Sequence, residues 1–253
     1  MNACGSVESK CKFMFSIVFL TSTRQHYNLN DVDRVSLEDL FKKSQLARKV
    51  DKLAHIKIIP GDENIAAEKI SFFKSLGFHV ISTTEDWKND HESHAHGLIK
   101  DIAKCYNHEL VKSNKFAFHL ENDWVFHTNE LDLLLDNSIR ILENNSSIVY
   151  HRYSRVDQPD IIQRLSGEKR DGFYLAKKEW SFNPAMLRSR DMIYISNFVL
   201  KNFERIHPHV EMAYEIAAKY LLNQENIFSF TDNSIVEHIG WEKQYNDFIN
   251  KNE

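Results

Sequence analysis

The most informative stretch of this chain is FAFHLENDWVF, residues 116–126. It opens with an apolar, aromatic-rich run that is typical of a buried strand, and Glu121, Asn122 and Asp123 follow. A carboxylate at the end of a buried strand loses several kcal/mol or more of hydration unless a cation or a basic side chain compensates it. On a continued strand, Glu121 and Asp123 would point to one face and could bind one divalent ion. The stretch therefore predicts a buried strand that ends in a metal site.

An ordinary turn is the alternative, in which Asp123 accepts hydrogen bonds from backbone N–H groups. The neighbouring residues favour the metal site, because HLENDW, residues 119–124, resembles the acidic D-x-D-type motif of nucleotide-sugar glycosyltransferases with the A-type fold. The resemblance implies that Glu121 and Asp123 bind Mn²⁺ or Mg²⁺ and that Asn122 lies at the donor nucleotide. Glu121 stands where the motif has its first Asp, and Asn122 replaces its middle acid. The second departure lowers the charge of the site by one and leaves the identity of the metal open.

Strand and helix patterns alternate along the chain, which predicts an α/β layer with a largely parallel sheet. We expect strands at 13–20, 55–59, 78–82, 116–120, 148–153, 173–176 and 235–239. We expect helices at 36–53, 65–76, 95–111, 129–143 and 209–222, and a helical or turn segment at 186–191. Ser36 and Asp39 suggest a cap for the first helix, and Gly77 suggests the end of the second. Together with the resemblance, these patterns imply one A-type, Rossmann-like α/β domain over residues 12–253, a mixed and mostly parallel sheet flanked by helices, after a flexible tail over 1–11.

Near the C-terminus, VEHIGW, residues 236–241, resembles the same family. Many of its metal-dependent members have a late histidine that completes the coordination of the ion, and His238 matches it. Imidazole suits Mn²⁺ better than Mg²⁺, which prefers oxygen ligands. A structural histidine is the alternative for His238.

Two segments resemble the acceptor side of these enzymes. SFNPAMLR, residues 181–188, resembles an F-N-P-x-L-x-R element at the donor–acceptor junction, which implies that Asn183 and the preceding Trp180 contact the acceptor. The alternative is that Asn183 begins a helix and Trp180 lies in the core. HPHVEMAYE, residues 207–215, resembles a helix that presents a carboxylate to the acceptor hydroxyl, so Glu211 would be the general base. Glu215 lies one turn further on the same face and could simply be solvated.

Residues that follow the first two predicted strands provide further candidates for the nucleotide site. Ligands of open α/β sheets bind outside the carboxyl ends of the strands. Thr21 and Arg24 follow the first strand, and Asp62 follows the second. Arg24 could neutralise a phosphate and Asp62 could accept a hydrogen bond from the base or ribose, although Thr21 and Asp62 also suit ordinary turns.

The histidine cluster of His91, His94 and His96 precedes the helix that leads to the fourth strand. Its spacing fits no common structural zinc site, and no cysteine lies near. A zinc site, a loop close to the donor and an ordinary loop all remain open for this cluster.

Composition excludes some functions. The 253 residues carry a net charge of −4, which disfavours nucleic-acid binding through a broad basic surface. The three cysteines form no paired framework, which favours a reduced, intracellular setting. No apolar run approaches the roughly 18 residues of a membrane span. We therefore expect a soluble, cytoplasmic protein.

The resemblance implies a metal-dependent glycosyltransferase that moves a sugar from a nucleotide diphosphate sugar to a hydroxyl of a glycan or glycoconjugate. With Glu211 as base, the transfer would invert the anomeric centre. A metal-dependent nucleotidyl or phosphoryl transferase is one alternative, but residues 21–24, TSTR, lack the glycine-rich loop that it would need. A non-catalytic nucleotide-sugar-binding protein on the same fold is the other.

Overall fold

The computed structural model describes residues 14–23, 29–84, 91–156, 166–176, 180–182, 184–207, 209–223 and 228–239. The predictions for the tail over 1–11, for Arg24 and for Asn183 lie outside these residues.

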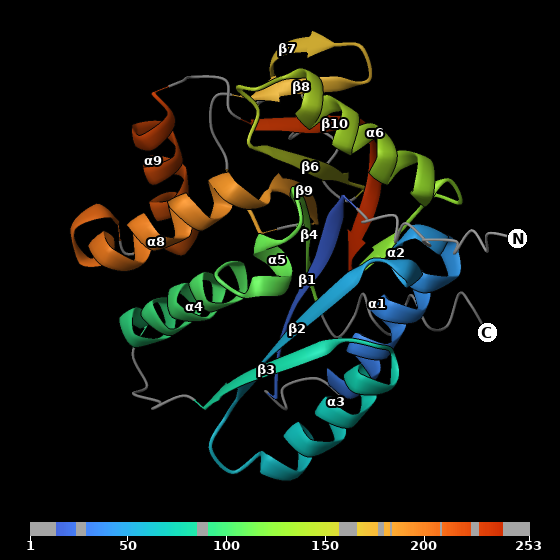
Figure 1. Cartoon of the computed structure of the whole chain (residues 1–253), viewed down its shortest axis with the longest axis vertical. Coiled ribbons are helices and arrows are strands. Elements are labelled where there is room, and N and C mark those ends of the chain that lie inside the picture. Colours follow the sequence, from blue (N-terminus) through green and yellow to red (C-terminus); the bar gives the residue numbers. More distant parts are fainter. Residues whose placement is uncertain are drawn as a thin grey trace, which may run out of the picture.

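A single mixed sheet of ten strands forms the centre of the structure (Figure 1). Its strand order is β3 (His79–Thr84), β2 (Asp51–Ile58), β1 (Phe15–Ser22), β4 (Phe116–Glu121), β9 (Ala185–Arg188), β6 (Tyr150–Arg155), β10 (Phe228–His238), β8 (Phe173–Ala176) and β7 (Ser166–Arg170), and β5 (Trp124–Phe126) pairs with the end of β10. The first four strands in this order are parallel, and β5, β8 and β9 run against the others. This arrangement confirms the predicted α/β class with a mixed, mostly parallel sheet.

Helices cover both faces of the sheet (Figure 1). One face carries α1 (Leu29–Lys43), α2 (Gln45–Lys49), α3 (Glu63–Ser75) and α6 (Leu131–Asn144), and the other carries α4 (His91–Tyr106), α5 (Glu109–Lys112), α8 (Ser189–Ile206) and α9 (Val210–Leu222). Alternate residues of β1 pack against the helices on opposite faces of the sheet. Ile17 and Phe19 pack in the α1–α3 layer, whereas Val18 and Leu20 pack in the α4–α9 layer, as the two-residue period of a strand requires.

The predicted helix at 36–53 is wrong at both ends. α1 begins at Leu29, so Ser36 lies inside a helix and does not cap one. Its hydroxyl donates to the backbone oxygen of Trp124 at 2.7 Å, and Asp39 accepts from the backbone N–H of Phe126 at 2.8 Å. Leu53 belongs to β2, where it pairs with Val18 of β1. Pairing with a neighbouring strand overrides the local helical spacing here.

The segment at 186–191, predicted as a helix or turn, begins as a strand and continues as a helix from Ser189. Residues 185–188 form β9, which is inserted antiparallel between β4 and β6, and α8 follows directly. The predicted helix at 95–111 is divided into α4 and α5, and β10 begins at Phe228, before the predicted start at 235. The short strands β5 and β7 were not predicted from the sequence. The helix over 63–75 ends as expected, because Gly77 has a φ of +80° that favours glycine.

Candidate active site

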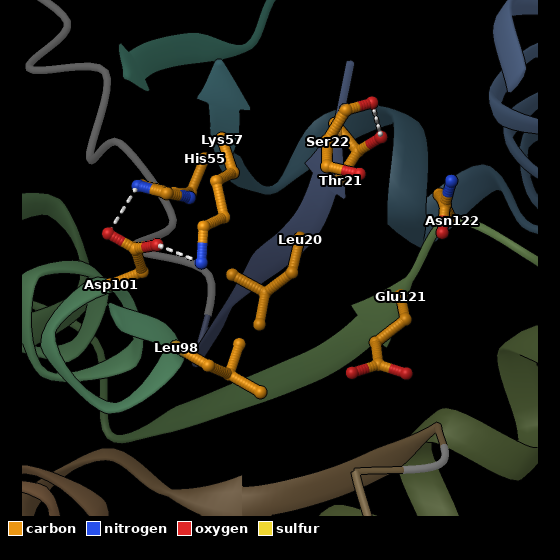
Figure 2. Close-up of a pocket in the computed structure, with 9 residues that line it drawn as sticks. All are labelled: Leu20, Thr21, Ser22, His55, Lys57, Leu98, Asp101, Glu121 and Asn122. Atoms are coloured by element: carbon orange, nitrogen blue, oxygen red, sulfur yellow. Dashed lines mark hydrogen bonds and ion pairs between the residues drawn. The ribbon is translucent and has the colours of Figure 1, made fainter. Parts of the chain in front are cut away.

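A pocket lies at the carboxyl ends of β1, β2 and β4, with α4 as one wall (Figure 2). Its volume is about 690 Å³, including the part that is open to solvent. The residues that line it are Leu20, Thr21, Ser22, His55, Lys57, Leu98, Asp101, Glu121 and Asn122. Open α/β sheets bind ligands at this edge because parallel strands end there together and their loops leave a crevice.

A buried group of charged and polar side chains forms one side of the pocket. The Asp101 carboxylate accepts from the Thr83 hydroxyl at 2.8 Å and lies 3.2 Å from Nε2 of His55, and Nζ of Lys57 is 4.0 Å from its other oxygen. Burial alone would raise the pKa of Asp101, but the bond and charge of His55, the Thr83 bond and the Lys57 charge together lower it. Asp101 is therefore ionised at neutral pH. Sequence reasoning missed this group, although two polar side chains two apart in a buried strand, His55 and Lys57, were a signal for it.

The acidic segment does not continue β4 as a strand. β4 ends at Glu121, and Asn122 and Asp123 form a turn before β5. The expectation that Glu121 and Asp123 share one strand face is therefore wrong. Glu121 lines the pocket from the end of β4 (Figure 2). Burial, the Asp123 charge and the Glu211 charge raise the pKa of Glu121 well above its usual range. The site therefore disfavours the carboxylate form of Glu121 unless a cation or a hydrogen-bond donor compensates it.

Asp123 and His238 are in direct contact. Oδ2 of Asp123 lies 2.8 Å from Nε2 of His238, and the carbonyl of Asp123 accepts from the backbone N–H of Ile239 at 2.7 Å. The antiparallel pairing of β5 with β10 aligns His238 with Trp124, and the two rings meet edge to face at 4.9 Å. This ladder places the late histidine beside the acidic turn.

The donor set suits a manganese or magnesium ion in part. Oδ1 of Asp123 is buried and has no hydrogen-bond partner among the described residues, which is costly without a cation or a donor. A carboxylate oxygen and an imidazole nitrogen are suitable Mn²⁺ ligands. Among the described residues, no three His, Cys, Asp or Glu side chains converge on one point, so Glu121 is not grouped with the other two. The structure brings together two of the three predicted ligands.

The predicted zinc alternative receives no support from the described side chains. The side chains of His91 and His94 lie outside the described residues. His96 stacks on Phe203 of α8, with 6.0 Å between the ring centres.

Two carboxylates of α9 hold a short segment between β8 and β9. Oε1 of Glu211 accepts from the backbone N–H of Phe182 at 3.2 Å, and Oε2 of Glu215 accepts from that of Trp180 at 3.1 Å. Glu215 also pairs with Lys219 at 2.6 Å. Glu215 is therefore not merely solvated, and both carboxylates fix the segment that the resemblance assigned to the acceptor side.

Trp180 lies in the core. Its side chain is 3% exposed and its ring contacts Tyr150, Tyr214 and Phe228 at centre distances of 5.1, 5.4 and 5.9 Å. A ring that is packed this closely has no face for a sugar. The structure supports the core alternative for this residue.

Of the residues predicted to bind the nucleotide at the strand ends, the structure describes Thr21 and Asp62, and it places them differently relative to the pocket. Thr21 lines the pocket, and its hydroxyl donates to Asp33 of α1 at 2.9 Å. Asp62 precedes α3 and is not among the residues that line the pocket. Of these two candidates, the structure brings only Thr21 to the pocket, while Arg24 lies outside the described residues.

Within the described residues, none of the helices combines the length and apolar character that a bilayer crossing needs.

The sequence matches no protein-family model and no curated protein.

Solved structures resemble the fold. S. aureus TarS in complex with UDP is 10% identical, with a TM-score of 0.50 over 89% of this chain and 60% of the TarS chain. GalNAc-T7 with UDP, GalNAc and Mn²⁺ is 8% identical, with a TM-score of 0.53 over 90% and 44% of the two chains. Mannose-1-phosphate geranyltransferase from Thermus thermophilus is 10% identical, with a TM-score of 0.51 over 90% and 77%. The chain thus spans about 60% of the first of these structures. These similarities show the A-type glycosyltransferase fold.

Proposed function

We propose that this chain is a metal-dependent glycosyltransferase that moves a sugar from a nucleotide diphosphate sugar to a hydroxyl of a glycan or glycoconjugate. The observation that carries the proposal is the contact of Asp123 with His238 next to the pocket at the ends of β1, β2 and β4. Two structures with the same fold hold UDP, and one of them holds Mn²⁺. The same ligand classes would suit this pocket and this pair.

The pocket residues would hold the donor nucleotide. Leu20 and Leu98 would supply apolar surface for a base, while Lys57 and the Ser22 hydroxyl would supply polar groups for ribose and phosphate. Glu121 and Asn122 would border the diphosphate from the end of β4. Asp123 and His238 would hold Mn²⁺ or Mg²⁺, which when bound stabilises the negative charge of the leaving nucleoside diphosphate.

Glu211 would act as the general base. It stands in the first turn of α9, and its bond to the Phe182 backbone orients the carboxylate. Its charge contributes to the raised pKa of Glu121, so the two carboxyl groups are near enough to interact electrostatically. The base would take the proton of the acceptor hydroxyl while that oxygen bonds to the anomeric carbon and the bond to the diphosphate breaks. A single displacement of this kind inverts the anomeric centre.

A panel of UDP-, GDP- and dTDP-linked sugars with Mn²⁺ tests the proposal. The measurement is nucleoside diphosphate release by the wild type, by Asp123→Ala and by the control Asp171→Ala, which changes an exposed aspartate in the β7–β8 turn. We expect metal-dependent release from one donor that Asp123→Ala loses and Asp171→Ala keeps. Calorimetric donor binding without release would favour the non-catalytic alternative. Neither binding nor release across the panel would overturn the proposal.

A further inference from the structure

A buried ion pair lies beneath the acidic turn, in the layer opposite the pocket. Asp33 of α1 and Lys69 of α3 are 1% and 2% exposed, and Nζ of Lys69 donates to Oδ2 of Asp33. Both helices pack on the α1–α3 face of the sheet. No predicted site residue belongs to the pair, and the proposed chemistry uses neither residue.

Three side chains from different parts of the fold interact with the Asp33 carboxylate. The Thr21 hydroxyl at the end of β1 donates to Oδ1 at 2.9 Å, Lys69 donates to Oδ2, and interaction with the side chain of Asn122 in the acidic turn lowers the pKa of the carboxyl group. Lys69 also lies 3.3 Å from the Thr21 hydroxyl. β1 and β4 are paired up to Leu20 and Glu121, so Thr21 and Asn122 are the next residues of the two strands. The carboxylate therefore ties the end of β1 to the turn that follows β4.

A buried ion pair is by itself weak evidence for a role in stability. Burial raises the pKa of Asp33 despite the opposing effects of Lys69, Thr21 and Asn122, so the folded protein disfavours the ionised carboxylate. Buried ion pairs can often be replaced by apolar residues of similar size without loss of stability. What the pair provides is geometry. Asn122 lies between Glu121 and Asp123, so an interaction that restrains its side chain also restrains the backbone from which the carboxylates on either side extend.

We propose that Asp33 and Lys69 are positioning residues, which hold Asn122 and thereby place Asp123 against His238 and Glu121 in the pocket. This inference rests on the proposed function for its catalytic meaning. The placement itself has a readout that needs no ligand. The carbonyl of Asp123 accepts the N–H of Ile239 at 2.7 Å, so hydrogen exchange at Ile239 reports on the turn. The N–H of His127, which bonds to Ile235 at 2.7 Å at the other end of the same ladder, is the internal control.

The test compares the wild type with Asp33→Leu/Lys69→Met, which replaces both charges with apolar side chains. The control is Ser138→Ala/Tyr153→Phe, which removes a buried hydrogen bond of 2.9 Å in the same layer, away from the pocket. We expect exchange at Ile239 to become about tenfold faster in the first variant, with the melting temperature nearly unchanged. His127 should exchange as in the wild type, and the control variant should leave both amides unchanged.

Calorimetry with Mn²⁺ and UDP or GDP provides the second measurement. We expect affinity to fall about tenfold or more in Asp33→Leu/Lys69→Met, the scale seen when residues that orient ligand side chains are removed. If the wild type binds no nucleoside diphosphate while exchange at Ile239 still becomes faster, the proposed function fails and the positioning of the turn stands. Unchanged exchange at Ile239 overturns the inference. So does equal acceleration at Ile239 and His127 with a lower melting temperature, because the pair would then serve general stability.

Discussion

Oδ2 of Asp123 lies 2.8 Å from Nε2 of His238, although the two residues come from segments far apart in the sequence. The β5–β10 ladder creates the contact, because it aligns His238 with Trp124, the residue after Asp123. Without a cation the two side chains form an ion pair or hydrogen bond. The two side chains are close enough to become ligands of one metal ion, and the metal site is proposed on that basis.

His238→Ala should weaken Mn²⁺-dependent binding of a nucleoside diphosphate about tenfold or more, because it removes one of two protein ligands. Calorimetric titration of UDP and GDP with and without Mn²⁺ measures the effect. Binding in the presence of EDTA should be as weak for the wild type as for the variant.

His127→Ala is the matched control for this change. His127 also comes from the β5–β10 region and pairs with a carboxylate, Glu237, at 2.6 Å, but it is 44% exposed. We expect its metal-dependent affinity to equal that of the wild type. Equal losses in the two histidine variants would contradict the metal site.

Glu211→Gln should lower the turnover number about 10²- to 10⁴-fold and leave donor affinity unchanged, because the base is lost. The glutamine oxygen can still accept from the Phe182 backbone, so the acceptor-side segment should remain in place. Steady-state rates with the donor identified in the panel measure the effect.

Glu215→Gln controls for the packing role of these carboxylates. It preserves an acceptor for the Trp180 backbone in the same way, one turn along α9. Its turnover should stay within a few-fold of the wild type. A large loss in both glutamine variants would mean that their shared structural role, rather than proton transfer, limits the reaction.

Trp180→Ala should lower the free energy of unfolding by about 3–5 kcal/mol, because it leaves a cavity among packed aromatic rings. Urea unfolding followed by circular dichroism measures the change. A loss below about 1 kcal/mol would indicate a peripheral ring and would revive the sugar-stacking role.

Two buried histidines should make the protein less stable in mild acid. Burial lowers the pKa of His119 and of His151 to about 3, whereas unfolded histidine titrates near 6.5. Between pH 7 and pH 5 the unfolded chain therefore gains protons that the folded protein excludes. Each histidine should lower the free energy of unfolding by about 2 kcal/mol over this interval, and stability returns above pH 6.5.

The measurement is the difference between His151→Asn and the wild type, since the raised pKa values of Asp33 and Glu121 act in the opposite direction in both proteins. Asparagine can still bond to the Ser229 hydroxyl, which lies 2.8 Å from the His151 ring. Urea unfolding at pH 7 and pH 5 should show a smaller acid loss for the variant, by about 2 kcal/mol. Identical losses would show that His151 is protonated in the fold.

Much of the fold could be predicted from the sequence, because its strands are apolar runs and the apolar residues of its helices recur at helical spacing. β4, β8, α3 and α9 lie within two residues of their predicted bounds. The prediction failed where a segment takes its conformation from a distant partner. β9 is a strand because β4 and β6 flank it, and Leu53 lies in a strand because Val18 is beside it. Local spacing contains no information about such partners.

For the candidate site, too, some features followed from local sequence and others depended on contacts between distant segments. The acidic pair after a buried strand made Glu121 and Asp123 candidates, and the family resemblance added Glu211 and His238. Neither could indicate that Asp123 contacts His238 while Glu121 lines the pocket, since that depends on where β4 ends and the turn begins. His55, Lys57 and Asp101 come from β2 and α4, and only the packed sheet brings them together.

Local patterns in the sequence predicted the α/β class, the order of most elements and an acidic segment after the fourth predicted strand, because hydrophobic period and residue chemistry are local properties. The tertiary structure decided which polar residues meet, which of them line the pocket, and that Trp180 is core. Each of these depends on contacts between segments distant in sequence. Burial in the assembled sheet also removes hydration from the charged groups there, and this loss must be compensated by partners that only the folded chain brings near.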